Sequence, residues 1–154
     1  MNSLLQPSNW VTAVTISLPD YASQMGNRLE SVMADNSLSI VEAHSCALAA
    51  ALAVGYGELA LEISMSNELR GNDIREEIAA SVIDMTINNV SRDCFTDLSI
   101  KITPYNLAVA MVLNDGASRV VIRSGLTEFG YTEEQLIDIA KIAGLIPPIG
   151  KCLI

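Results

Sequence analysis

The stretch from Thr103 to Gly130, TPYNLAVAMVLNDGASRVVIRSGLTEFG, decides the fold that the sequence predicts. Thr103 is a typical N-cap residue, and Pro104 suits the first turn of a helix because that turn leaves its N–H groups unpaired anyway. The segment Asn114-Asp115-Gly116 interrupts the apolar pattern. The stretch therefore predicts two helices that meet at a polar junction, an arrangement suited to a small site.

Further helix signals flank this stretch on both sides. Ser39 followed by Glu42 is a capping box that opens an alanine-rich helix, and Gly55 breaks that helix. Thr132 with Gln135 repeats the capping pattern before the last helix. Apolar residues also recur at helical spacing between these signals. We expect these further helices over residues 17–35, 39–54, 58–66, 73–90 and 133–143.

The two ends of the chain are expected to differ from this helical body. Residues 1–17 lack helical periodicity, and the β-branched run Val11 to Leu18 favours an extended segment or an apolar arm. Strand signals are confined to this region, so the sequence predicts an all-α domain over residues 18–154 behind an N-terminal arm. Pro147-Pro148 is expected to stop or kink the last helix, and the apolar tail Ile149 to Ile154 to dock on a neighbour.

Composition narrows the range of partners. The 154 residues suit one domain, and the net charge of −9 repels nucleic acid and anionic lipid. Half of the residues are apolar and only 18% are charged, which favours a homo-oligomer with an apolar interface. Apolar runs are too short for a membrane span, and the first ten residues do not read as a signal peptide. We therefore expect a cytoplasmic location and no membrane association.

Cysteine and histidine are scarce. The three cysteines are odd in number and include no Cys-x-x-Cys pair, so they do not form a disulfide framework. With His44 as the one histidine, a zinc site is hard to assemble, and no metal or cofactor is predicted. Cys46 and His44 are interpreted as packed residues. Cys94 is the most plausible reactive thiol, and Cys152 is a weaker candidate for a disulfide between subunits.

The chain contains, in this order, the segments Leu18 to Ala22, Ser39 to Ala53, Ile87 to Val90, Leu107 to Asn114 and Gly130 to Glu134. Taken together, these segments resemble the alkylhydroperoxidase D type proteins of the carboxymuconolactone decarboxylase superfamily. The two halves of the chain also share a rhythm of capped helix, glycine break and second helix, which suggests an internal duplication. The resemblance extends over most of the chain, from about residue 18 to 151.

The resemblance implies an all-helical bundle and a trimer or larger ring. In active members it also implies a peroxidase site with a Cys-x-x-Cys pair at a helix N-terminus, a histidine one turn later and a glutamate one helix upstream. A helix N-terminus and a nearby imidazolium lower the pKa of a thiol, and a Glu-His contact relays the proton. This chemistry depends on all four residue types.

In this sequence the four positions of that site are substituted. The two cysteine positions fall on Asp115 and Ser118, the histidine position on Ile122 and the glutamate position on Thr103. Neither Asp nor Ser cycles through a disulfide, and Ile cannot move a proton. The sequence therefore predicts a catalytically degenerate member of the family with a non-redox, oligomeric role in binding or structure.

Two alternatives remain open at this stage. Asp115, Arg119 and Arg123 are spaced four residues apart, and they suit either a non-thiol enzyme of the decarboxylase type for a small carboxylated substrate or a solvated helix face. The other alternative is a regulatory module that binds a partner through the arm or the tail. The sequence also leaves open whether His44 or Cys94 reaches the vestigial site from another segment or subunit.

Overall fold

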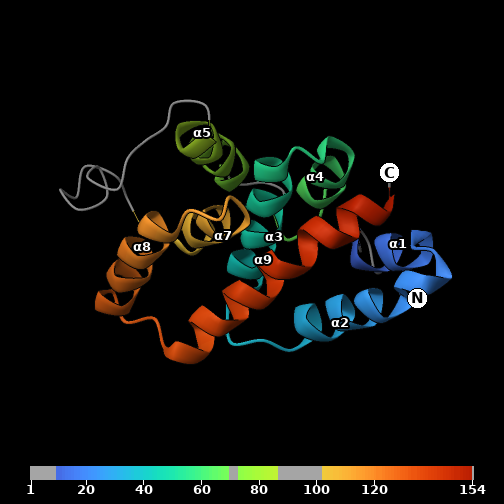
Figure 1. Cartoon of the computed structure of the whole chain (residues 1–154), viewed down its shortest axis with the longest axis horizontal. Helices are drawn as coiled ribbons and strands as arrows, with labels where there is room; N and C mark the ends of the chain where they lie inside the picture. The colour runs from blue at the N-terminus through green and yellow to red at the C-terminus, as the bar shows by residue number, and fades with distance from the viewer. Residues whose placement is uncertain (1–9, 70–72, 87–101, 154) are drawn as a thin grey trace.

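The computed structural model describes residues 10–69, 73–86 and 102–153. All regular secondary structure in these ranges is helical (Figure 1), which confirms the all-α prediction. The alkylhydroperoxidase D-like bundle and the internal duplication stay predictions. The elements are α1 (Trp10–Ser17), η1 (Asp20–Ala22), α2 (Ser23–Ala34), α3 (Ile40–Val54), α4 (Gly57–Ser64), α5 (Ile74–Thr86), α7 (Pro104–Val112), α8 (Gly116–Glu128) and α9 (Glu133–Leu153).

Helix α3 forms the centre of the molecule and packs against α4, α5, α7 and α9 (Figure 1). Its middle, from Ala43 to Ala51, is almost entirely small and is buried, apart from the partly buried His44. Small side chains let neighbouring helix backbones approach closely while the interior stays densely packed. The alanine-rich pattern in the sequence therefore corresponds to a helix that is covered on nearly every side.

Helix termini follow the expected capping patterns. The Ser39 hydroxyl accepts a bond from the Glu42 amide at 3.1 Å, and the Glu42 carboxylate accepts one from the Ser39 amide at 3.0 Å. Thr132 and Gln135 form the corresponding pair before α9. Gly55 ends α3 with a left-handed φ of 82°, a conformation that glycine adopts without strain. These predictions from the sequence are confirmed.

The extended segment expected at Val11 to Leu18 is wrong, because residues 10–17 form α1. Trp10, Val11 and Val14 lie on one face of this helix and are buried in the same core as the rest of the chain. Packing of that face outweighs the low helix propensity of the β-branched residues. The separate arm stays a prediction only for residues 1–9, which lie outside the described ranges.

The double proline does not stop the last helix, since α9 continues through Pro147 and Pro148 to Leu153. Ile146 and Ile149 flank the prolines and are fully buried. Burial of apolar side chains on both sides offsets the backbone hydrogen bonds that proline removes. The tail that was expected to dock on a neighbour thus begins inside the core of its own chain.

The remaining differences concern the ends of helices. The first predicted helix begins as the short η1 turn before α2, and the helix predicted over 58–66 runs over Gly57–Ser64. The helix predicted over 73–90 is α5, whose described part ends at Thr86. Of the helices that the structure describes, none has the length and apolar character needed to span a membrane.

Candidate functional site

The junction between α7 and α8, residues 113–115, has the local structure that the sequence predicts. Asn114 adopts a positive φ of 58°, which Asn tolerates better than most residues. The Asp115 carboxylate then accepts a hydrogen bond at 3.1 Å from the Ser118 amide and caps α8. The Asp115 side chain is therefore engaged in starting a helix, and we call this region the α7–α8 junction.

The fold also uses the other positions at which the resemblance would place a peroxidase site. Thr103 is buried and caps α7 by accepting a bond from the Asn106 amide at 3.3 Å. Ser118 is buried in the first turn of α8, and Ile122 is fully enclosed in the core. Thr103 and Asp115 are therefore helix caps. Ser118 and Ile122 are buried in the first two turns of α8.

A buried polar network continues from Thr103 across to α5. The Asn106 side-chain oxygen accepts bonds from the Thr103 amide and hydroxyl, each at 2.9 Å. Its NH₂ group donates to the Ser81 hydroxyl and lies 3.7 Å from the Met85 sulfur. Because buried polar groups are costly without partners, this network fixes α5 against α7. The sequence predicts the Thr103 cap but does not identify Asn106 as its partner.

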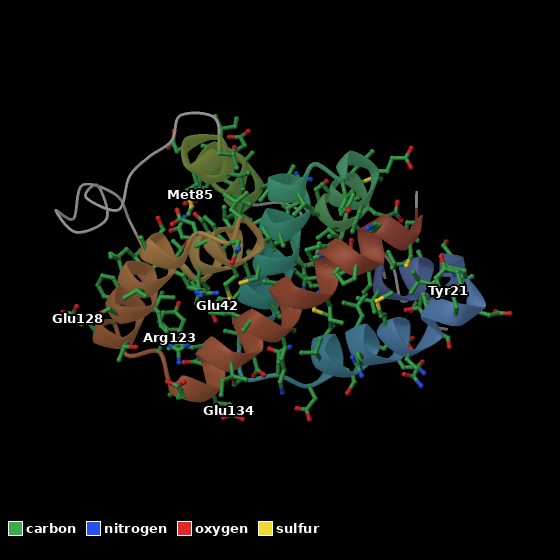
Figure 2. All side chains as sticks on the ribbon, in the orientation of Figure 1. Tyr21, Glu42, Met85, Arg123, Glu128 and Glu134 are labelled. Carbon is green, nitrogen blue, oxygen red and sulfur yellow. The ribbon has the colours of Figure 1, made fainter. Side chains whose placement is uncertain are left out.

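The trio Asp115, Arg119 and Arg123 lies on an exposed face of α8. Arg123 pairs with the Glu133 carboxylate at the start of α9, and the two side chains are 45% and 66% exposed. Figure 2 places Arg123 at the end of the molecule where α8 leads into α9. Exposed pairs of this kind stabilise a fold by only about 0–1 kcal/mol. An incoming carboxylate would have to compete with Glu133 for this arginine.

A second, partly buried contact joins α3 to the segment before α9. The Tyr131 hydroxyl donates to the Glu42 carboxylate at 2.5 Å, across 89 residues of sequence. Burial raises the pKa of Tyr131, and the bond to Glu42 raises it further. Burial also raises the pKa of Cys46, with a smaller contribution from the Glu42 charge. A fully buried thiol that stays protonated is a packing residue, as the sequence predicts for Cys46.

His44 is packed and hydrogen-bonded, as expected. Its Nδ1 atom lies 2.9 Å from the Ile40 carbonyl oxygen, and its ring meets the Trp10 ring edge-on at 6.1 Å. Its Nε2 atom lies 3.8 Å from a Glu68 carboxylate oxygen. None of these partners belongs to the α7–α8 junction. Cys94, the other side chain that the sequence left as a candidate to reach that site, lies outside the described residues.

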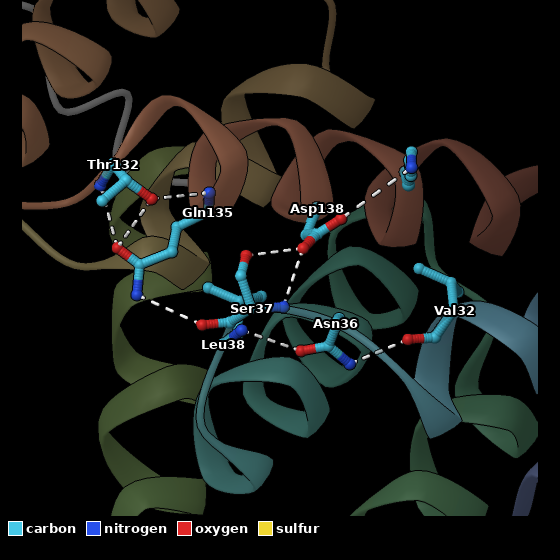
Figure 3. Close-up of polar contacts among 8 residues, drawn as sticks. Val32, Asn36, Ser37, Leu38, Thr132, Gln135 and Asp138 are labelled. Atoms are coloured by element: carbon cyan, nitrogen blue, oxygen red, sulfur yellow. Dashed lines mark hydrogen bonds and ion pairs between the residues drawn. The ribbon is translucent and has the colours of Figure 1, made fainter.

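A third polar cluster ties the α2–α3 connection to α9 (Figure 3). The buried Asp138 carboxylate accepts bonds from the Ser37 amide at 2.8 Å and the Ser37 hydroxyl at 2.6 Å. Gln135 donates to the Ser37 carbonyl at 3.3 Å. The Asn36 side chain accepts a bond from the Leu38 amide and donates one to the Val32 carbonyl. The two Ser37 bonds satisfy one carboxylate oxygen, and Lys141 Nζ lies 4.0 Å from the other, so the cluster holds the α2–α3 connection against α9.

The concave feature of interest lies elsewhere, where α1, the α3–α4 turn and the end of α9 meet. This hollow, which we call the α1–α4–α9 groove, has a volume of about 690 Å³. Small-molecule sites in proteins commonly have volumes of this order. From the sequence alone, Gly55 is expected only to break a helix. The groove is lined by Ala13, Val14, Ser17, Gly55, Tyr56, Gly57, Glu58, Leu59, Glu62, Gly150 and Leu153.

Comparison with known proteins adds no family assignment. The chain matches no protein-family model, and no curated protein matches it significantly. Within the described ranges, no group of three or more His, Cys, Asp or Glu side chains is placed to hold a metal ion.

Proposed function

We propose that this protein is a catalytically degenerate member of the alkylhydroperoxidase D-like proteins with a non-redox, oligomeric role in binding or structure. The observation that carries the proposal is the use of Thr103, Asp115, Ser118 and Ile122. Two of these residues cap helices, and the other two are buried. A chain that uses these positions for stability has no need to keep them chemically reactive.

The chemical argument supports the same proposal. Thiol peroxidase turnover needs a low-pKa thiolate and a second thiol to resolve the oxidised intermediate. Asp115 and Ser118 supply neither group, and the Ile122 side chain neither accepts nor donates a proton. Cys46 is fully buried and its pKa is raised, so it does not provide the thiolate from a neighbouring helix.

The oligomeric part of the proposal is supported by apolar side chains on the surface. Ile40 is 65% exposed at the start of α3, while Val120 and Phe129 on α8 and its C-cap are each 67% exposed. Exposed apolar side chains of this size commonly lie in contacts between subunits. A trimer or larger ring would cover such residues.

The proposal is tested by assaying the full chain for peroxide reduction with dihydrolipoamide and with a thioredoxin-type reductant. We expect no turnover above the buffer rate. The matched variant is Cys94→Ser, because the sequence makes Cys94 the most plausible reactive thiol. Turnover in the parent chain that disappears in Cys94→Ser would overturn the proposal. Sedimentation equilibrium on the same sample measures the oligomeric state. A monomer at all concentrations would contradict the oligomeric role.

A second candidate, favoured by the exposed arginines on α8, is a non-thiol enzyme that acts on a small carboxylated substrate. Asp115, Arg119 and Arg123 would then form the anion site. Titration with succinate should shift amide signals on α8, and Arg119→Gln should weaken the binding. An unchanged spectrum at high succinate concentration would exclude this candidate.

A further inference from the structure

The α1–α4–α9 groove combines apolar walls with two carboxylates. Val14, Leu59 and Leu153 contribute apolar surface, and Tyr56 contributes an aromatic ring. Glu58 and Glu62 stand one helical turn apart on α4, and both are exposed. Among the described residues, neither glutamate forms an ion pair with a basic side chain. The groove therefore offers negative charge beside an apolar surface.

Helix ends add to this negative charge. The last turn of α1, the C-cap of α3 at Gly55 and the last turn of α9 all contribute lining residues. The C-terminus of a helix carries the equivalent of roughly half a negative charge. One positive helix end, the N-terminus of α4, also reaches the groove, but Glu58 in its first turn counters it. The exposed Lys151 is not among the lining residues.

The position of the Tyr56 ring is held by a glycine. A Cβ atom at Gly150 would lie 2.3 Å from the Tyr56 ring, so the ring lies directly on the α9 backbone. Gly150 is buried and Tyr56 is half-buried, which leaves part of the ring available to a ligand. Aromatic faces attract cations, and the attraction grows when water is excluded.

From these observations we infer that the α1–α4–α9 groove binds a small organic ammonium ion with an apolar body. The ammonium group lies between the Glu58 and Glu62 carboxylates, and the apolar body lies along Val14, Tyr56 and Leu59. Carboxylates facing an apolar wall disfavour anions and give neutral molecules no charge partner. The inference is independent of the proposed function, because the groove shares no residue with the α7–α8 junction.

The test is a titration of the isotopically labelled full chain followed by amide chemical shifts. Three probes of similar shape differ in charge: phenethylammonium, 2-phenylethanol and 3-phenylpropionate. We expect phenethylammonium to shift signals of the groove residues and to bind about tenfold more tightly than the alcohol, with the carboxylate weakest. Added salt should reduce that preference, because the two glutamates are exposed.

Matched variants separate charge from shape. Glu58→Gln together with Glu62→Gln should weaken phenethylammonium binding by about tenfold and leave the alcohol unchanged. The control is Glu76→Gln with Glu77→Gln, two exposed glutamates in the first turn of α5. This control should change the affinity by less than about twofold. Far-UV circular dichroism of both variants should match that of the parent chain.

Several outcomes would overturn the inference. Equal binding of the alcohol and the ammonium ion would show that charge plays no part. Shifts confined to residues outside the groove, or an unchanged affinity in the Glu58→Gln and Glu62→Gln variant, would place the cation elsewhere. If groove signals instead shift on dilution of the protein alone, then a second copy of this chain occupies the groove.

Discussion

The α7–α8 junction and the α1–α4–α9 groove use their polar side chains in different ways. In Figure 1, α8 lies toward one end of the long axis and α1 toward the other. At the junction, Asp115 caps α8, and at the other end of α7 Thr103 caps that helix. In the groove, Glu58 and Glu62 have no basic partner among the described residues. Polar groups that are already satisfied within the fold serve stability, whereas exposed charges beside an apolar hollow remain available to a ligand.

The largest effect that would test this contrast is expected at Ile122. Ile122→Ala removes a fully buried side chain from the first turns of α8 and leaves a cavity in the core. We expect a loss of about 3 kcal/mol in the free energy of unfolding, measured by urea denaturation. Ser124→Ala, at an exposed position on the same helix, is the control and should change it by less than about 0.5 kcal/mol. A loss below about 1 kcal/mol at Ile122 would show that this position is not part of the packed core.

A smaller effect is expected at the floor of the groove. Gly150→Ala places a methyl group within 2.3 Å of the Tyr56 ring, which must move. We expect a loss of about 2 kcal/mol in the free energy of unfolding by the same measurement. Gly144→Ala is the control on the same helix, because a Cβ atom there meets open space. It should stabilise the protein by about 0.5–1 kcal/mol.

The effect of Gly150→Ala should depend on the Tyr56 ring. In a Tyr56→Ala background the added methyl group has room, so the second substitution should cost much less than it does alone. This double-mutant cycle isolates the contact between the ring and the α9 backbone. Additive losses from the two substitutions would mean that Gly150 matters for another reason.

The smallest effect is expected at the cap of α8. Asp115→Ala removes the side-chain oxygen that accepts from the Ser118 amide, and we expect a loss of about 1 kcal/mol in thermal or urea unfolding. Asp115→Asn keeps an acceptor at the cap and should stay within a few tenths of a kcal/mol of the parent chain. If Asp115→Ala left stability unchanged, the carboxylate would be free for another role, and the contrast with the groove would weaken.

Local patterns in the sequence were sufficient for the helical body and for part of the junction. Ser39 with Glu42, and Thr132 with Gln135, are pairs three residues apart whose hydrogen bonds form within one turn. Such contacts depend on neighbours in sequence and are readable from it. The start of α7 at Thr103 and the break at Gly55 follow from the same local chemistry.

Long-range contacts account for the features that the sequence did not predict. Tyr131 meets Glu42 across 89 residues, and Asp138 meets Ser37 across 101 residues. The groove likewise joins the first helix, the α3–α4 turn and the last helix. No local pattern places such residues together, because their proximity results from how the helices pack.

The sequence by itself therefore determined the all-α class and the positions of the main helix caps. Only the tertiary structure decided that residues 10–17 are helical and that α9 passes through Pro147 and Pro148. In both places, burial of apolar side chains in a shared core outweighs a local preference against helix. That preference acts within a single turn, whereas the core is built from helices that are far apart in the chain.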